Sequence, residues 1–126
     1  MFSTAALNYT MGMTVEDKLG LRVRILRDRR GWSQPALAER IDRSIDMISK
    51  IETGASAPSF ETLKRLSREL DVPLRDLFDF EGAGNDAKRL ELLTEISDIV
   101  RHLKTKDLAH AADLMATFEK HIAESR

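Results

Sequence analysis

The chain has 126 residues, in which 20 Lys and Arg nearly balance 21 Asp and Glu to give a formal net charge of −1. This length allows one domain, or a small domain with an extension, and the lack of cysteine excludes disulfides, thiolate metal sites and cysteine nucleophiles. The low Gly and Pro content, beside many Leu, Ala, Glu and Arg residues, predicts an all-α protein. Apolar runs are too short to cross a bilayer, and we expect a cytoplasmic protein without membrane contact.

The chain begins with a segment, residues 1–14, that lacks the features of a secretory signal and that we expect to be a flexible tail. A helix is predicted from Val15 to Arg30, and Gly31 is a typical residue to end it. Apolar spacing of three and four residues gives this helix one buried face, made by Leu19, Val23 and Leu26. Leu21 and Ile25 lie on a second face, and we expect the C-terminal helices, or those of a partner, to cover them.

Three further helices each follow a serine whose hydroxyl can cap the first turn: Ser33, Ser44 and Ser59. Their apolar residues are, in order, Leu37, Ala38 and Ile41; Ile48 and Ile51; and Phe60, Leu63, Leu66 and Leu70. A last short helix carries Leu74, Leu77 and Phe78. Five helices with short links predict a compact helical domain over residues 15–80.

Residues 81–86 are small and polar, which predicts a linker, and residues 87–124 contain two amphipathic helices. Such helices cannot bury their apolar faces alone, so they dock onto the first domain or onto another chain. We regard them as the candidate dimerisation element, through Leu93, Ile96, Val100, Leu103, Leu108, Met115, Phe118 and Ile122. The alternative is that they fold back and that the dimer forms elsewhere.

The segments Ser33–Arg40 and Ser44–Glu52 have the pattern of a helix-turn-helix. Two helices that cross near a right angle need a small residue at their closest approach, and Ala38 supplies it. The turn between them needs a residue that tolerates a left-handed backbone, and Asp42 is one of the few residues other than glycine that do.

Motif residues of a known family occur in order across this domain: Leu19, Val23, Leu26, Arg27, Gly31, Ser33, Gln34, Leu37, Ala38, Ile48, Ser49, Ile51, Glu52, Gly54, Pro58, Ser59, Thr62, Leu63 and residues 74–78. On these residues, positions 19–80 resemble the XRE family of bacterial and phage regulators, the Cro/cI-type helix-turn-helix. The resemblance implies a five-helix, lambda-repressor-like fold with Ser44–Glu52 as the recognition helix in the major groove of double-stranded DNA. It implies DNA contacts by Gln34, Arg43, Ser44, Ile45, Asp46, Met47, Ser49 and Lys50.

The recognition helix departs from the amide and basic residues that are common at its start in the family. Ile45 is suited to pack on a thymine methyl group, and Asp46 to accept a hydrogen bond from the N4 amine of cytosine. The loop after Gly54 lacks the usual Lys or Arg, so some phosphate contacts of the family are missing. Lys50, Gln34, Arg43 and DNA shape then carry more of the recognition.

The net charge of −1 argues against a nucleic-acid partner until it is divided along the chain. Residues 18–52 contain nine basic and five acidic side chains, an excess of +4, and the flanking segments are acidic. The basic excess therefore lies in the segment expected to face DNA.

Other conspicuous residues have structural interpretations. Arg27 is expected to pair with Glu52 or a helix end, and Trp32 to lie in the core. The histidines, His102, His110 and His121, do not have the spacing of a zinc site, and we expect no metal and no cofactor.

These observations predict a sequence-specific DNA-binding transcriptional regulator, acting as a homodimeric repressor. The alternative is an antitoxin-type autoregulator that binds a protein partner through its C-terminal helices. No nucleophile with a nearby base, glycine-rich phosphate loop or metal cluster supports an enzyme.

Overall fold

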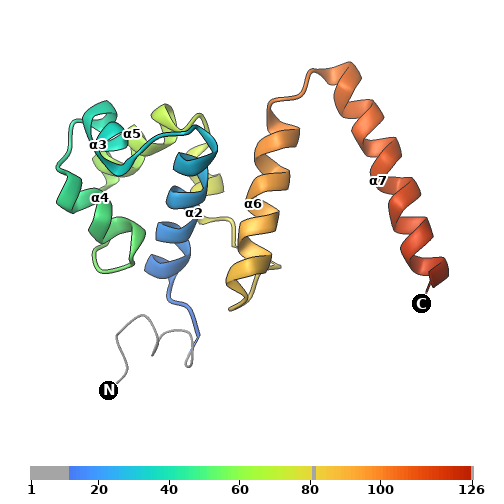
Figure 1. Ribbon diagram of the computed structural model, residues 1–126, viewed down its shortest axis with the longest axis horizontal. Helices are drawn as coiled ribbons and strands as arrows, with labels where there is room; N and C mark the ends of the chain where they lie inside the picture. The colour runs from blue at the N-terminus through green and yellow to red at the C-terminus, as the bar shows by residue number, and fades with distance from the viewer. Residues whose placement is uncertain (1–11, 81, 126) are drawn as a thin grey trace. The chain divides into compact units, whose positions relative to one another are not determined.

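The computed structural model describes residues 12–80 and 82–125, and every regular element in this part of the chain is a helix (Figure 1). The predicted all-α class is confirmed. None of the described helices is both long and apolar enough to cross a membrane. Residues 1–11 of the predicted tail and Glu81 of the predicted linker lie outside the described residues.

The helices follow the order predicted from the sequence. They are α2 (Val15–Arg29), α3 (Gln34–Ile41), α4 (Ile45–Glu52), α5 (Phe60–Glu69), the 3-10 helix η1 (Leu74–Phe78), α6 (Ala87–Arg101) and α7 (Thr105–Ser125). Helix α2 packs on α4 and η1, α3 packs on α4 and α5, and α5 packs on η1. Together these contacts enclose a single core in the first five elements.

Side-chain caps fix where the helices begin. The predicted serines, Ser33, Ser44 and Ser59, each accept a hydrogen bond from the backbone N–H three residues on. Helix α2 begins with a reciprocal capping box between Thr14 and Asp17, which the sequence analysis did not identify. Next to it, the backbone N–H of Met13 donates to Asn85 Oδ1 at 2.9 Å, so the last residues assigned to the tail are anchored.

The core consists of the apolar faces predicted for the first five helices. Its members are Leu19, Val23, Leu26, Leu37, Ala38, Ile41, Ile48, Ile51, Leu63, Leu66, Leu70, Val72 and Leu77. Phe60 differs from the expectation: its side chain is 65% exposed because it is the first residue of α5 and lies at the edge of the buried face. Trp32 is partly buried against the core, as expected, and the guanidinium of Arg40 lies 3.9 Å from the centre of its ring.

Gly20 sets the distance between α2 and α4. A β-carbon at this position would clash with the carbonyl oxygens of Ile51 and Glu52. The two backbones therefore touch where α2 crosses the end of α4, and only glycine fits there. This role of Gly20 was not predicted from the sequence.

The chain divides into two compact units, one up to Glu95 and the other from Ile96 onward. The first unit therefore extends beyond the predicted linker at residues 81–86 and includes the first turns of α6. Leu90 of α6 is 1% exposed. Residues of α2 and α6 in this unit line one shallow pocket: Leu21, Arg24, Ile25 and Asp28 with Ala87, Lys88 and Glu91. Ile25 is 8% exposed, so the start of α6 lies beside the second apolar face of α2 that the sequence showed.

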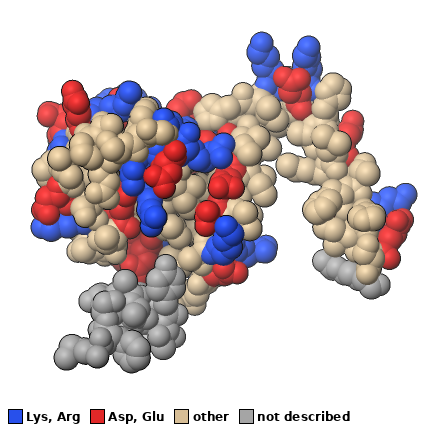
Figure 2. Space-filling model, viewed as in Figure 1, with Lys and Arg blue, Asp and Glu red and all other residues tan. Residues whose placement is uncertain are grey.

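The second unit contains α7, which has no buried residue along its length. In Figure 2 uncharged side chains cover most of the visible face of α7, and charged side chains lie mainly near its two ends. Its exposed apolar side chains include Leu108, Leu114, Met115 and Phe118. An apolar face of this length is typical of a helix that binds another surface.

We predict that Gly20→Ala destabilises the protein, although alanine favours a helix interior over glycine by about 1 kcal/mol. The added methyl group forces α2 away from α4, and overpacking of this kind costs about 1–3 kcal/mol. The free energy of unfolding, measured by urea denaturation, should therefore fall. Gly31→Ala is the control, because its β-carbon meets no atom within 4 Å and only its φ of +71° is unfavourable. A Gly20→Ala protein more stable than the parent would contradict the close approach.

Candidate nucleic-acid interface

The turn between α3 and α4 is held by backbone and side-chain hydrogen bonds. Asp42 adopts the left-handed conformation with φ of 54°, as predicted. The backbone N–H of Arg43 donates to Ala38 O at 2.9 Å, and Arg65 of α5 donates to Ile41 O at 3.0 Å. These bonds satisfy carbonyls at the end of α3 and fix the direction in which α4 leaves the turn.

Helix α4 has one buried and one exposed face. Ile48 and Ile51 are 0% and 1% exposed and belong to the core. Ile45, Asp46 and Lys50 lie on the opposite face, where Ile45 is 52% exposed. Asp46 and Lys50 form an ion pair with 3.0 Å between Oδ2 and Nζ. The face of α4 that the sequence assigned to DNA is therefore accessible in the free protein.

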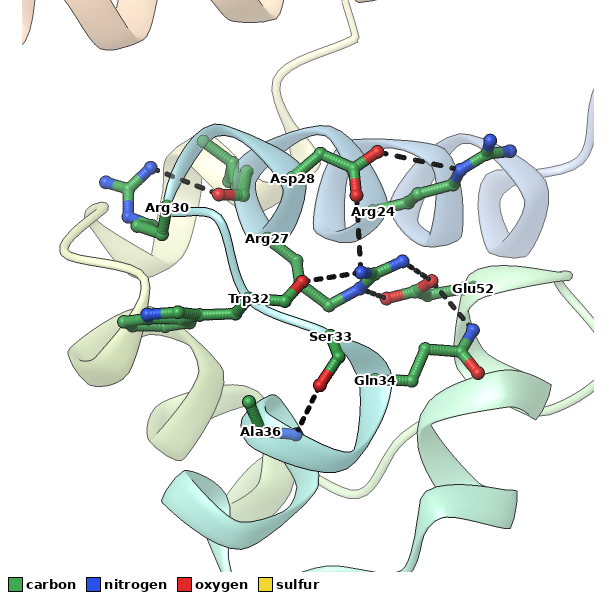
Figure 3. A network of polar contacts seen from close by, with 10 residues as sticks. Arg24, Arg27, Asp28, Arg30, Trp32, Ser33, Gln34, Ala36 and Glu52 are labelled. Atoms are coloured by element: carbon green, nitrogen blue, oxygen red, sulfur yellow. Dashed lines mark hydrogen bonds and ion pairs between the residues drawn. The ribbon is translucent and has the colours of Figure 1, made fainter.

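A buried ion pair joins α2 to the end of α4 (Figure 3). Arg27 Nε donates to Glu52 Oε2 at 2.7 Å and Nη2 donates to Oε1 at 2.9 Å, which is a bidentate pair. The side chains are 11% and 3% exposed. The hydrogen bond to Glu52 raises the pKa of Arg27 above its ordinary value, against the opposing effect of burial. The expected pairing of Arg27 with Glu52 is thus present.

Two further groups join this pair. Arg27 Nη1 donates to the carbonyl oxygen of Trp32 at 2.7 Å, which fixes the chain between α2 and α3. Gln34 Nε2 donates to Glu52 Oε1 at 3.1 Å. Gln34 is one of the predicted DNA contacts, and the bond to Glu52 orients its amide at the first residue of α3 before any ligand arrives.

Other predicted contact residues also have partners within the protein. Arg43 is partly buried, and its Nε donates to Thr62 Oγ1 at 3.0 Å while Nη1 donates to Asp42 O at 2.8 Å. The hydroxyl of Ser44 caps α4, and Met47 packs against the core. The bond between Arg43 and Thr62 was not predictable from local sequence, because the two residues are 19 positions apart, one in the turn before α4 and the other in α5.

The predicted dimerisation residues lie on two helices. Leu93, Ile96, Val100 and Leu103 are on α6 or just after it, and Leu108, Met115, Phe118 and Ile122 are on α7. Ile96, Leu108, Met115 and Phe118 are between 43% and 64% exposed. The four residues of α7 are seven, three and four positions apart and so share one face of the helix. The described residues contain no cluster of three or more His, Asp or Glu arranged to hold a metal ion.

One comparison with known protein families concerns this same region. Residues 18–79 match a family model described as a helix-turn-helix domain. This part of the chain is similar to helix-turn-helix domains. The match covers α2 to η1 and confirms, at this level, the resemblance found in the sequence.

One curated protein and one solved structure are similar to this chain. A 64-residue stretch, 50% of this chain, is 41% identical to the HTH-type transcriptional regulator SlrR of Bacillus subtilis (strain 168). That stretch spans 42% of the length of SlrR, less than half of the relative. The crystal structure of the clp gene regulator ClgR from Corynebacterium glutamicum has a similar fold, with a TM-score of 0.51, 23% identity, and 75% of this chain and 96% of that chain covered.

We predict that Glu52→Ala lowers the free energy of unfolding by about 3–5 kcal/mol, because it removes the buried counter-charge of Arg27 and leaves the guanidinium only the more exposed Asp28, 3.2 Å away. Urea denaturation followed by the fluorescence of Trp32, the single tryptophan, measures this loss. Glu61→Ala is the matched control, since Glu61 also pairs with a cation at 3.0 Å but on the surface, where such pairs contribute at most about 1 kcal/mol. Equal losses in the free energy of unfolding for the two variants would show that the Arg27–Glu52 pair contributes no more to stability than a surface pair.

Proposed function

We propose that this protein is a sequence-specific double-stranded DNA-binding transcriptional regulator of the XRE type. Helix α4 lies in the major groove, with Ile45, Asp46, Ser49 and Lys50 toward the base edges and the nearby phosphate backbone. Gln34 at the start of α3 contacts the phosphate backbone beside them. In this arrangement α3 crosses the backbone and α4 reads the sequence.

One observation carries the proposal: α4 follows a fixed turn and presents an exposed face while its other face is locked into the core. A groove-reading helix needs both properties, because contacts with base edges depend on orientation and on access. The helix-turn-helix match over residues 18–79 and the regulatory relatives support the same function.

The proposed form is a homodimer that represses transcription. A single small domain makes few phosphate contacts, and two copies related by a two-fold axis bind half-sites one helical turn apart. The unpartnered apolar face of α7 supports a dimer through the C-terminal helices. A dimer bound at a promoter blocks access to that DNA without any further surface, and we therefore assign it the role of a repressor.

The decisive experiment is the selection of bound sequences from random double-stranded DNA by the full chain. We expect a palindromic consensus whose half-sites are about 10 bp apart, centre to centre. Recovery of sequences with no consensus would contradict specific recognition, and a single half-site would contradict the dimer. Placing the selected sequence over a reporter promoter then tests the sign of regulation.

We predict different effects for two residues on the exposed face of α4. Ile45→Ala should relax the preference at one base position of the selected site by about 1–3 kcal/mol. Lys50→Ala should weaken binding to the selected site without changing its base preference, and lower the slope of log affinity against log salt there by about one unit, because it removes a phosphate contact. Fluorescence anisotropy at several salt concentrations measures both. If both variants lose affinity equally for every sequence, α4 is not the reading helix.

We predict that Met115→Glu combined with Phe118→Glu dissociates the dimer, because two carboxylates then lie in its apolar interface. Size-exclusion chromatography with light scattering gives the mass. Ala116→Glu combined with Thr117→Glu is the matched control, which adds the same charge on the other side of α7. A dimer unaffected by the first pair places the interface elsewhere. A parent chain that is monomeric at all concentrations would instead favour a different protein partner for α7.

A further inference from the structure

The exposed face of α4 carries no net charge. Its acid and its base are Asp46 and Lys50, whose side chains are 74% and 57% exposed and whose charged atoms are 3.0 Å apart. The other acid of the helix, Glu52, is buried and bound to Arg27. A helix proposed to face a polyanion therefore presents a carboxylate beside its one ammonium group.

This arrangement opposes general attraction to DNA. Affinity that does not depend on sequence arises from Lys and Arg groups that replace counterions on phosphates. Lys50 is already paired with Asp46, and the carboxylate itself is repelled by phosphates. An acid at the second position of α4 also stabilises the helix by its interaction with the helix dipole. That role alone would give Asp46 no effect on the affinity for DNA or on the choice of base. The two roles are therefore separable by experiment.

We infer that Asp46 is a specificity-determining residue, which neutralises Lys50 on non-target DNA and releases it where the major groove offers the N4 amine of cytosine. This inference rests on the function proposed above. At a cytosine the carboxylate accepts a hydrogen bond, and Lys50 becomes available to a phosphate. Adenine is a poorer partner, because the acceptor N7 adjoins its amine and repels a carboxylate. At other bases Asp46 loses water without gaining a donor, which penalises the wrong site.

The test compares the full-length parent with Asp46→Asn on random-sequence DNA and on the selected site, at several salt concentrations. Asp46→Asn should bind random DNA more tightly than the parent, and its slope of log affinity against log salt should steepen by about one unit as Lys50 reaches a phosphate. Its preference for the selected site over random DNA should fall by roughly tenfold. The selected site of the parent should contain a cytosine that the site selected by Asp46→Asn lacks. An adenine at that position of the parent's site, or the same base in both selected sites, overturns the assigned base.

A double-mutant cycle shows whether the effect passes through Lys50. Lys50→Ala should cost more affinity for random DNA in the Asp46→Asn background than in the parent, since only there is the ammonium group free. Equal costs in the two backgrounds would overturn the coupling.

The matched control is Glu91→Gln, which removes one acid from the exposed Lys88–Glu91 pair, 3.5 Å long, on α6. Glu91 lies beside Leu21 and Arg24, a face of α2 different from the one that touches α4. If Glu91→Gln and Asp46→Asn change DNA binding equally, net charge alone explains the result and the inference fails. It also fails if Asp46→Asn lowers the thermal midpoint and weakens binding to all DNA together. A parent that binds no DNA would overturn the proposed function as well. If the parent binds its selected site specifically, either of these failures contradicts only the role inferred for Asp46.

Discussion

The bidentate pair between Arg27 and Glu52 is the interaction on which the position of α4 depends. Removing two charges from water is costly, and the cost is recovered only where the geometry is good and the remaining donors are used. Both conditions hold, because Arg27 also donates to the Trp32 carbonyl and Glu52 also accepts from Gln34. One buried pair thereby connects the first helix, the following turn, the start of α3 and the end of α4. Gly20 completes this constraint, since its missing side chain lets the backbone of α2 touch the carbonyls at the end of α4. Because the end of α4 is bound to α2, the helix cannot rotate about its axis. The helical period then determines which of its residues face the solvent.

Sequence patterns predicted the elements well because the signals for them are local. The hydroxyls of Ser33, Ser44 and Ser59 act within three residues, and the left-handed turn at Asp42 needs only its own backbone preference. Contacts between distant segments were less accessible. The ion pair between Arg27 and Glu52 was one of two predicted alternatives for Arg27, and that prediction depended on the resemblance to a known family. Nothing in the sequence showed that Thr62 holds Arg43, or that Gly20 touches α4. The exposure of Phe60 was missed because a helical period does not tell where the buried face ends along a helix.

The predicted boundary after the helix-turn-helix domain shows the same limit. Residues 81–86 have the composition of a linker, yet Ala83 is 4% exposed and Asn85 accepts from the backbone of Met13. Small polar residues are common both in mobile linkers and in tight turns, because glycine permits the positive φ found at Gly82 and Gly84. Composition alone cannot distinguish the two. The burial of Leu90, together with the compact unit that ends at Glu95, places the start of α6 with the first unit, so a domain boundary here follows burial rather than composition.

The contacts within the protein change how many of the basic residues in the positively charged segment are available to bind phosphate. The excess of +4 in residues 18–52 counts every Lys and Arg equally, but a guanidinium engaged inside the protein contributes little to phosphate binding. Arg27 is bound to Glu52 and Arg43 to Thr62, while Arg22 is 7% exposed and donates to the Asp76 carbonyl. The cations left to attract DNA are therefore fewer than the count indicates. In the homodimer proposed above, weak attraction per copy makes affinity depend on two copies and on the match between α4 and its proposed site. A regulator built this way discriminates by geometry, because charge alone would hold it to any DNA.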